Sequence, residues 1–93
     1  MKFKLTSNTK IVFGVKLFQI QAEIDFVTYS QDNIKKGQLG GWVESEKNIN
    51  QKDKSWVFGN AQVSGNARVF ENARVFENAR VFGNVQVSGN ALV

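Results

Sequence analysis

Valine and alanine recur with a fixed period in the second half of the chain. From Val57 onward the sequence divides into the six-residue units VFGNAQ, VSGNAR, VFENAR, VFENAR, VFGNVQ and VSGNAL, and Val93 follows the last of them. Each unit begins with valine, and an alanine stands two places before the next valine except at Val85. A period of six matches neither a coiled-coil heptad nor the alternation of a hairpin, so it predicts a repeat architecture.

Each unit predicts a short strand that ends in a corner. Side chains alternate along a strand, so the valine points inward while its two neighbours point outward. The alanine is expected to fill the corner. The pairs Gly-Asn and Glu-Asn supply the turn, because asparagine adopts the left-handed backbone region more readily than most residues do. One unit is therefore one side of a coil.

The charges indicate how many sides form one coil, because like charges that stack on neighbouring strands are destabilising. Two sides per coil would place Arg68 on Arg80. Three sides, or eighteen residues, bring no like charges together and set Arg74 between Trp56 and Leu92. We therefore expect triangular coils. The same period stacks three pairs of asparagines into short amide ladders, namely Asn60 with Asn78, Asn66 with Asn84 and Asn72 with Asn90.

The register extends backwards to Val43 and Ile49 if residues 50–56 hold a two-residue insertion at a corner. The expected fold is all-β, with residues 42–93 forming a short parallel β-helix of about three triangular coils. Residues 1–41 are expected to be a small β-rich cap, because a bare first coil would expose its apolar interior and its backbone edge.

The cap region predicts two or three strands over residues 2–5, 10–13 and 15–22. The pairs Ser7-Asn8 and Phe13-Gly14 are its turn signals. Three further glycines are expected to make the tight turns that connect the cap to the coils, namely Gly37, Gly40 and Gly41.

The repeats GNARV and GNAQV, together with the preceding segment KKGQLGGWVESEKNINQ (residues 35–51), resemble the hexapeptide-repeat proteins of the YdcK-like group. This resemblance implies the left-handed parallel β-helix of the hexapeptide acyltransferase superfamily. Short members with the LGGWVESE segment are similar to proteins common in bacteriophages and prophages. The acyltransferases of that superfamily rely on a histidine base and on a CoA-binding groove between long helices of coils. This chain has no histidine and room for only about three coils, so their catalytic residues cannot be transferred to it.

The composition bears on the question of catalysis. The chain contains neither histidine nor cysteine, which removes the commonest general base, the commonest metal ligand and all thiolate chemistry. Glu44, Glu46 and Asp53 are expected to belong to a solvated loop, since no base or nucleophile accompanies them. We therefore expect no enzymatic activity, catalytic residue, cofactor or metal site.

The net charge of +4 is unevenly distributed, because all nine lysines precede residue 55. Most of them are expected on solvated faces. The longest apolar stretches, residues 11–15 and 17–20, are far too short to span a bilayer, and no leader sequence is recognisable. The expected location is the cytoplasm of a bacterial host.

Several phenylalanines occupy strand positions that should face outward, and Trp56, Phe58, Arg74, Phe76 and Leu92 fall on one triangular face. Monomers seldom expose so much contiguous apolar surface. Either the N-terminal segment covers this face or a partner does, and the aromatic and arginine content favours a partner. The apolar end layer of Val81, Val87 and Val93 favours a homodimer through the β-helix. The predicted partner or dimer interface comprises Trp56, Phe58, Phe70, Arg74, Phe76, Arg80, Phe82, Leu92 and Val93.

The leading functional hypothesis is a non-catalytic protein that binds a host protein or nucleoprotein complex. The resemblance to phage-borne proteins implies inhibition of a bacterial defence system, for example of a CRISPR nuclease complex. A second hypothesis is a structural or assembly module of a phage or mobile element. A third is nucleic-acid binding through the basic cap, and an acyltransferase is a distant fourth. The lysines of the third hypothesis are Lys2, Lys4, Lys10, Lys16, Lys35 and Lys36.

Overall fold

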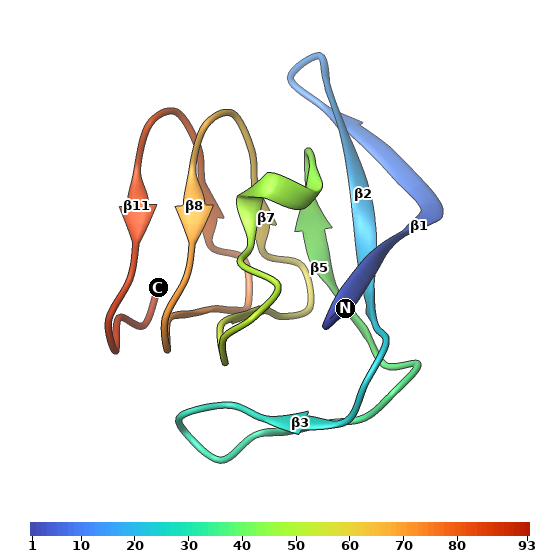
Figure 1. Ribbon diagram of the computed structural model, residues 1–93. Helices are drawn as coiled ribbons and strands as arrows, with labels where there is room; N and C mark the ends of the chain where they lie inside the picture. The colour runs from blue at the N-terminus through green and yellow to red at the C-terminus, as the bar shows by residue number, and fades with distance from the viewer.

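The chain begins with a long β-hairpin. In the computed structural model, which describes residues 1–93, strand β1 (Phe3–Val12) pairs antiparallel with β2 (Val15–Ala22) (Figure 1). Phe13 and Gly14 form the predicted turn, and both have positive φ angles, 49° and 78°. Positive φ at both central residues is the requirement of a type I′ hairpin turn.

The pair Ser7-Asn8 does not form the predicted turn. It lies inside β1, where the pairing register shifts after Leu5 but the strand continues. The hydroxyl of Thr6 donates to the carbonyl of Gln19 at 2.8 Å, and the Asn8 amide donates to the Gln19 side chain at 3.0 Å. These side-chain bonds join the two strands across the irregularity, so one bulged strand replaces the two that were expected.

The hairpin and part of the repeat region share one sheet. Strand β5 (Leu39–Val43) pairs antiparallel with β2 and parallel with β7 (Gln62–Val63), and β7 pairs with β10 (Arg80–Val81). The sheet order is β1-β2-β5-β7-β10. The predicted boundary between the cap and the repeats, at residues 41 and 42, falls inside β5. Because β5 hydrogen-bonds to β2 of the hairpin and to β7 of the repeats, one sheet spans this boundary.

Two smaller elements complete the N-terminal half. Strands β3 (Phe26–Val27) and β4 (Asn33–Ile34) pair as an antiparallel ribbon, which extends beneath the repeats in Figure 1. The 3₁₀ turn η1 (Glu46–Asn48) follows β5. Only η1 is helical, and the fold holds no helix with the length and apolarity to cross a membrane.

The remaining repeat strands form two more parallel ladders. Strand β6 (Trp56–Val57) pairs with β9 (Arg74–Val75), and β8 (Arg68–Val69) pairs with β11 (Gln86–Val87). In all three ladders the later repeats pair with residues eighteen positions earlier, as the charge argument predicted.

In two pairings nearer the N-terminus, Val43 with Val63 and Ile49 with Val69, the paired residues are two positions further apart in the sequence. This difference agrees with the predicted insertion between Ile49 and Val57.

The core is a stack of inward valines. The repeat valines from Val57 to Val87 are buried, and so are Val43 and Ile49, as expected from strand alternation. The corner alanines Ala61, Ala67 and Ala73 are buried with them. The hydrophobic cluster continues without interruption into the N-terminal half through Phe3, Ile20, Ala22, Ile34 and Trp56.

The corners differ from the prediction in one respect. The left-handed residue is the glycine or glutamate that precedes the asparagine, with φ of 54° at Gly59, 62° at Glu71 and 58° at Glu77. The turn closes when the alanine N–H donates to the carbonyl three residues earlier, as from Ala61 to Phe58 at 3.0 Å. Asparagine is therefore not needed for the strained position.

The asparagine side chains instead join repeats that are eighteen residues apart. The Asn66 amide donates to Asn84 at 3.1 Å, and the Asn72 amide donates to Asn90 at 3.0 Å. Two of the three predicted ladders thus carry hydrogen bonds, whereas the Asn60 and Asn78 pair forms none.

Gly37 lies in a turn with φ of 91°, as predicted, but Gly40 and Gly41 do not. Both lie in β5 and are buried. A Cβ atom would come within 2.8 Å of the Trp56 ring at Gly40 and within 2.5 Å of Val57 at Gly41. These glycines permit close packing of β5 against β6 and the corner after it rather than a change of direction.

Candidate functional site

The predicted aromatic face is largely covered by the N-terminal half of the chain. Trp56 has no exposed surface, because its ring packs edge-on against Phe3 and Phe26 at centroid distances of 6.3 and 5.3 Å. The expectation that Trp56 contacts a partner is therefore wrong. Strand alternation predicts that a side chain points outward from the repeats. It does not predict whether another segment of the same chain packs against that side chain.

Arg74 is held on the same face. Its Nε lies 2.8 Å from Oδ2 of Asp32, with the N–H not aligned for a hydrogen bond, so the contact is an ion pair. The guanidinium also stacks between the rings of Phe58 and Phe76, at 5.2 and 5.3 Å from their centroids. Arg74 and both half-buried rings thus already have partners within the chain.

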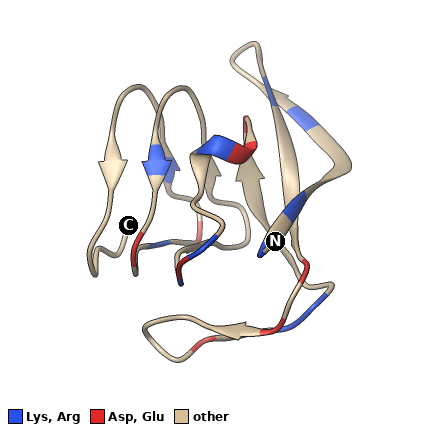
Figure 2. Cartoon of the chain, in the orientation of Figure 1, with Lys and Arg blue, Asp and Glu red and all other residues tan.

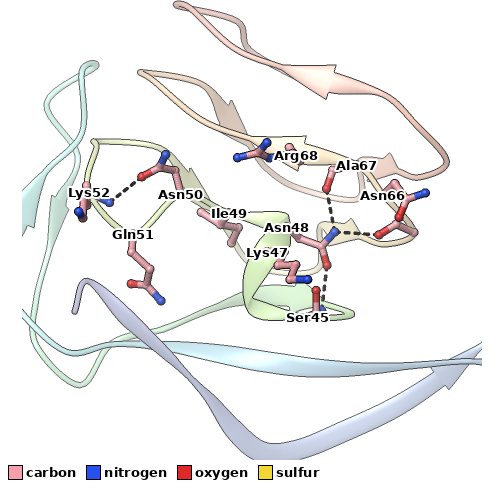
Figure 3. A pocket seen from close by; sticks show the side chains of 11 residues that line it. Ser45, Lys47, Asn48, Ile49, Asn50, Gln51, Lys52, Asn66, Ala67 and Arg68 are labelled. Atoms are coloured by element: carbon pink, nitrogen blue, oxygen red, sulfur yellow. Dashed lines mark hydrogen bonds between the residues drawn. The ribbon is translucent and has the colours of Figure 1, made fainter.

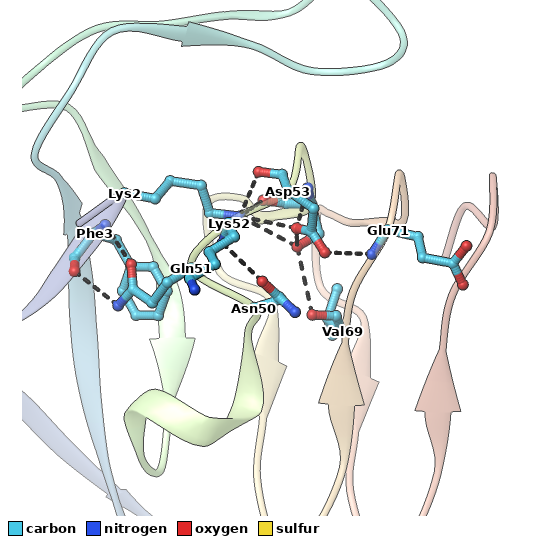
Figure 4. A network of polar contacts seen from close by, with 9 residues as sticks. Lys2, Phe3, Asn50, Gln51, Lys52, Asp53, Val69 and Glu71 are labelled. Carbon is cyan, nitrogen blue, oxygen red and sulfur yellow. Dashed lines mark hydrogen bonds and ion pairs between the residues drawn. The ribbon is translucent and has the colours of Figure 1, made fainter.

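Lys2 is buried rather than solvated (Figure 4). Its ammonium donates to the carbonyl oxygens of Ser55 at 2.6 Å and Asp53 at 3.1 Å, and lies 3.3 Å from Oδ1 of Asp53. Burial lowers the pKa of Lys2 from 10.5 to about 8, although the charge and the hydrogen bond of Asp53 favour the charged form. This finding removes Lys2 from the predicted basic surface.

Asp53 likewise differs from the expected solvated loop residue. Its carboxylate accepts hydrogen bonds from the N–H and hydroxyl of Ser55 and from the N–H of Glu71. Together with Lys2, Asp53 joins the start of the chain, the segment before β6 and the corner at Glu71. Its role in the fold is structural.

A groove lies between the hairpin and strands β7 and β10, and two exposed aromatic side chains, Phe13 and Phe82, border it. We call this hollow of about 540 Å³ the hairpin groove. Leu17 and Val81 are its buried residues, and Phe13 and Phe82 on its rim are 88% and 66% exposed. The lining residues are Val12, Phe13, Val15, Leu17, Glu44, Gln62, Ser64, Gly65, Arg80, Val81, Phe82 and Gly83.

Adjacent side chains form a row along the sheet at this groove. The ladder registers place Trp42 beside Gln62 and Gln62 beside Arg80. At one end Lys10 Nζ lies 4.4 Å from the centre of the Trp42 ring, and at the other end the Arg80 guanidinium lies 4.8 Å from the centre of the Phe13 ring. Two cation–π contacts therefore connect the hairpin to the sheet across the row.

The hairpin groove is lined by one charge of each sign, Arg80 and Glu44. Lys10 pairs with the lining residue Leu17 and shares its face of the hairpin, whereas Lys16 lies on the opposite face by strand alternation. Glu44 is the one carboxylate that lines the groove, and its Oε1 accepts a 2.6 Å hydrogen bond from the N–H of Gly65. The basic residues alternate with other groups along the chain in Figure 2 and form no continuous stripe.

The predicted interface residues do not come together at one place. Arg80 and Phe82 lie at the hairpin groove, whereas Phe70 is half-buried beside Arg68 in another ladder. Leu92 and Val93 are exposed. The residue pattern did not identify Phe13 and Glu44 as members of the groove. An aromatic residue in a two-residue hairpin turn was a usable signal, because a side chain at a hairpin tip is seldom covered.

The described residues contain no cluster of three or more histidine, cysteine, aspartate or glutamate side chains that could hold a metal ion. Figure 3 shows a second hollow, which is polar and lies between η1 and the corner before β8.

Comparison with known proteins identifies the repeats. The family model described as the YdcK beta solenoid repeat matches the chain twice, over residues 61–77 and 73–89. No curated protein matches the chain. The match covers strands β7 to β11 and the corners between them, which include two of the ladders with the eighteen-residue register. Residues 61–89 of this all-β chain are thus similar to the β-solenoid repeat of the YdcK type.

Proposed function

We propose that this chain is a non-catalytic protein-binding protein and that the hairpin groove is its contact surface. The main support for the proposal is the exposure and the backbone conformation of Phe13. Its side chain is 88% exposed, and its backbone has a φ of 49°, which bulky residues rarely adopt. A left-handed conformation costs roughly 1–2 kcal/mol for a residue with a Cβ atom. The contact of its ring within the chain is the cation–π contact with Arg80 at 4.8 Å.

The turn type supports the same reading. Two-residue type I′ loops favour Asn-Gly, Asp-Gly or Gly-Gly, because these residues adopt positive φ without strain. The chain has Phe-Gly at this place. Strain and exposed apolar surface at one residue are typical of a functional contact rather than of folding stability. Ile11, which is 73% exposed on the adjoining strand, extends the apolar tip.

The charges favour an acidic partner protein over a second copy of the chain. Arg80 lines the groove and Lys10 lies on the same face of the hairpin, so a second copy would add the same two cations to the contact. Like charges across an interface cost affinity, whereas a negative surface around an inserted apolar side chain would complement the groove. We therefore assign a partner with an acidic rim and an apolar anchor.

The finer architecture belongs to the same proposal. We propose that the three ladders close into a short left-handed β-helix of about three triangular coils, capped by the N-terminal strands. Support comes from the eighteen-residue register and from the family match. Such a stack would hold the groove on a rigid platform. A crystal structure with right-handed connections between the ladders would contradict it.

For the biological role we propose inhibition of a bacterial defence complex, such as a CRISPR nuclease, by a protein of phage or prophage type in the bacterial cytoplasm. Support is limited to the similarity of the LGGWVESE segment to short phage-borne proteins and to a surface suited to binding. The test is a phage-interference assay in cells that carry a defined CRISPR system. Wild-type protein is expected to restore infection by a targeted phage.

The decisive variant is Phe13→Asn, which keeps the type I′ turn and removes the aromatic side chain. We expect at least about tenfold weaker binding to the purified nuclease complex and loss of inhibition. Tyr29→Ser is the matched control, since Tyr29 is also exposed but lies in the loop between β3 and β4. Equal affinities for wild type and Phe13→Asn would exclude the groove as the contact.

A homodimer through the repeats is the second candidate, favoured by the exposed Val85 and Leu92. Light scattering of the purified chain distinguishes it. A dimer that Val85→Glu dissociates and Phe13→Asn leaves intact would favour self-association or a structural module over binding at the groove.

A further inference from the structure

The polar hollow in Figure 3 has a chemistry different from that of the hairpin groove. It encloses about 630 Å³ between η1, the segment that follows it and the corner before β8. Lys47, Lys52 and Arg68 line it, and no carboxylate does. The only apolar residues of its wall are Ile49 and Ala67.

None of the three cations has a counter-ion in the chain. The two ion pairs of the molecule are Lys2 with Asp53 and Arg74 with Asp32. Lys47, Lys52 and Arg68 are exposed and take part in neither pair. Three unpaired like charges around one concave surface repel one another and raise the local potential for anions. Their arrangement therefore favours a negatively charged ligand over empty solvent.

A buried amide holds the shape of the hollow. Oδ1 of Asn48 accepts the N–H groups of Glu44 and Ser45 at 3.0 and 2.9 Å. Its Nδ2 donates to the carbonyls of Gly65 and Ala67 at 3.3 and 2.8 Å. All hydrogen-bonding positions of Asn48 are thus used within the fold, so its function is to lock the two walls together. A rigid wall lowers the entropic cost of ligand binding.

The wall chemistry selects among anions. No aromatic ring lines the hollow, so it lacks the stacking surface on which proteins hold nucleobases. Arginine and lysine with nearby amides are the groups that proteins use to bind phosphate oxygens. We propose that the polar hollow binds a ligand with two or more phosphate groups through Lys47, Lys52 and Arg68. An oligophosphate chain and the backbone of a nucleic-acid duplex both present this chemistry.

The test is isothermal titration calorimetry of the full chain with inorganic tripolyphosphate at low and at moderate salt. Arg68→Gln is expected to weaken binding about tenfold or more, because a charge-assisted hydrogen bond is lost. This substitution is compatible with the fold, since glutamine occupies the same position of the repeat at Gln62 and Gln86. Lys47→Gln and Lys52→Gln are expected to weaken binding as well.

The matched control is Lys36→Gln, which removes one charge from an exposed residue that does not line the hollow. Its affinity is expected to stay within about twofold of wild type. Competition with a short duplex DNA distinguishes backbone phosphates from free oligophosphate. The proposal is overturned if tripolyphosphate does not bind at low salt, if Lys36→Gln weakens binding as much as Arg68→Gln, or if an oligoglutamate peptide binds more tightly.

Discussion

Lys2 shows how one side chain in an unexpected environment changes the energetics of the fold. Its ammonium lies between β1 and the segment before β6, bonded to residues more than fifty positions away. Desolvation destabilises the charged form, and the bonds to Asp53 and Ser55 compensate only in part, so the pKa falls to about 8. The buried charge serves as a connection between the two halves of the chain and carries a pH-dependent cost.

We expect the free energy of unfolding to rise as the pH increases from about 8 to 10.5. In this window the unfolded chain keeps the Lys2 proton and the folded chain releases it, so the unfolded state binds more protons. The cost is fully present below about pH 8, and its removal adds up to about 3 kcal/mol. Urea denaturation at a series of pH values measures the rise.

The comparison variant is Lys2→Met, which keeps an apolar stem and removes the titrating group. Over this window the free energy of unfolding of wild type should rise relative to that of Lys2→Met. The exposed Lys36→Met variant should show the same pH dependence as wild type. Parallel pH profiles for wild type and Lys2→Met would show that Lys2 does not titrate as described.

At the scale of the element, the corner is the unit of the repeat. The carbonyl of Phe76 accepts the N–H of Ala79, and Glu77 between them has a φ of 58°. Most equivalent corners use glycine, for instance Gly59 and Gly83. Glu77 makes no side-chain hydrogen bond or ion pair, so nothing in the chain offsets its backbone strain.

We therefore expect Glu77→Gly to stabilise the fold by up to about 1 kcal/mol. Relief of the left-handed strain, roughly 1–2 kcal/mol, exceeds the extra entropy that glycine gives to the unfolded chain. Thermal denaturation followed by circular dichroism measures this change. Glu77→Ala removes the same charge but keeps the Cβ atom, and it should show no comparable gain. Stabilisation by both variants alike would instead indicate a charge effect.

For the whole molecule, the central point is that one sheet and one core join the hairpin to the repeats. Strand β5 hydrogen-bonds to β2 on one side and to β7 on the other. Trp56 lies at the junction, packed between Phe3 and Phe26 and close enough to Gly40 to exclude a Cβ atom there. The two halves therefore stabilise each other.

We expect a single cooperative unfolding transition. Tryptophan fluorescence reports the junction around Trp56 and Trp42, and far-ultraviolet circular dichroism reports the strands as a whole. The two urea transitions should coincide in midpoint and slope. A fluorescence change that precedes the loss of β-structure would indicate that the hairpin detaches from an independently stable repeat region.

Much of the repeat half was predictable from the residues alone. The inward valines, the eighteen-residue pairing, the insertion after Ile49 and the asparagine ladders follow from strand alternation and from stacking, which repeat in every unit. Less of the candidate site was predictable. The residue pattern identified Arg80 and Phe82 as interface residues, but it identified Phe13 only as a turn residue. It also predicted that Trp56 contacts a partner, although this side chain is buried within the chain.

The periodic pattern by itself determined the type of repeat, its register and its core, because each valine and corner is set by neighbours at a fixed spacing. Only the tertiary structure decided which outward side chains remain exposed. That outcome depends on where the aperiodic N-terminal strands pack, and their contacts join residues far apart in the chain, such as Lys2 with Asp53 and Phe3 with Trp56. The hairpin groove is a product of that packing, whereas the polar hollow is lined only by residues in and around η1 and by residues 65–68 at the corner that leads into β8.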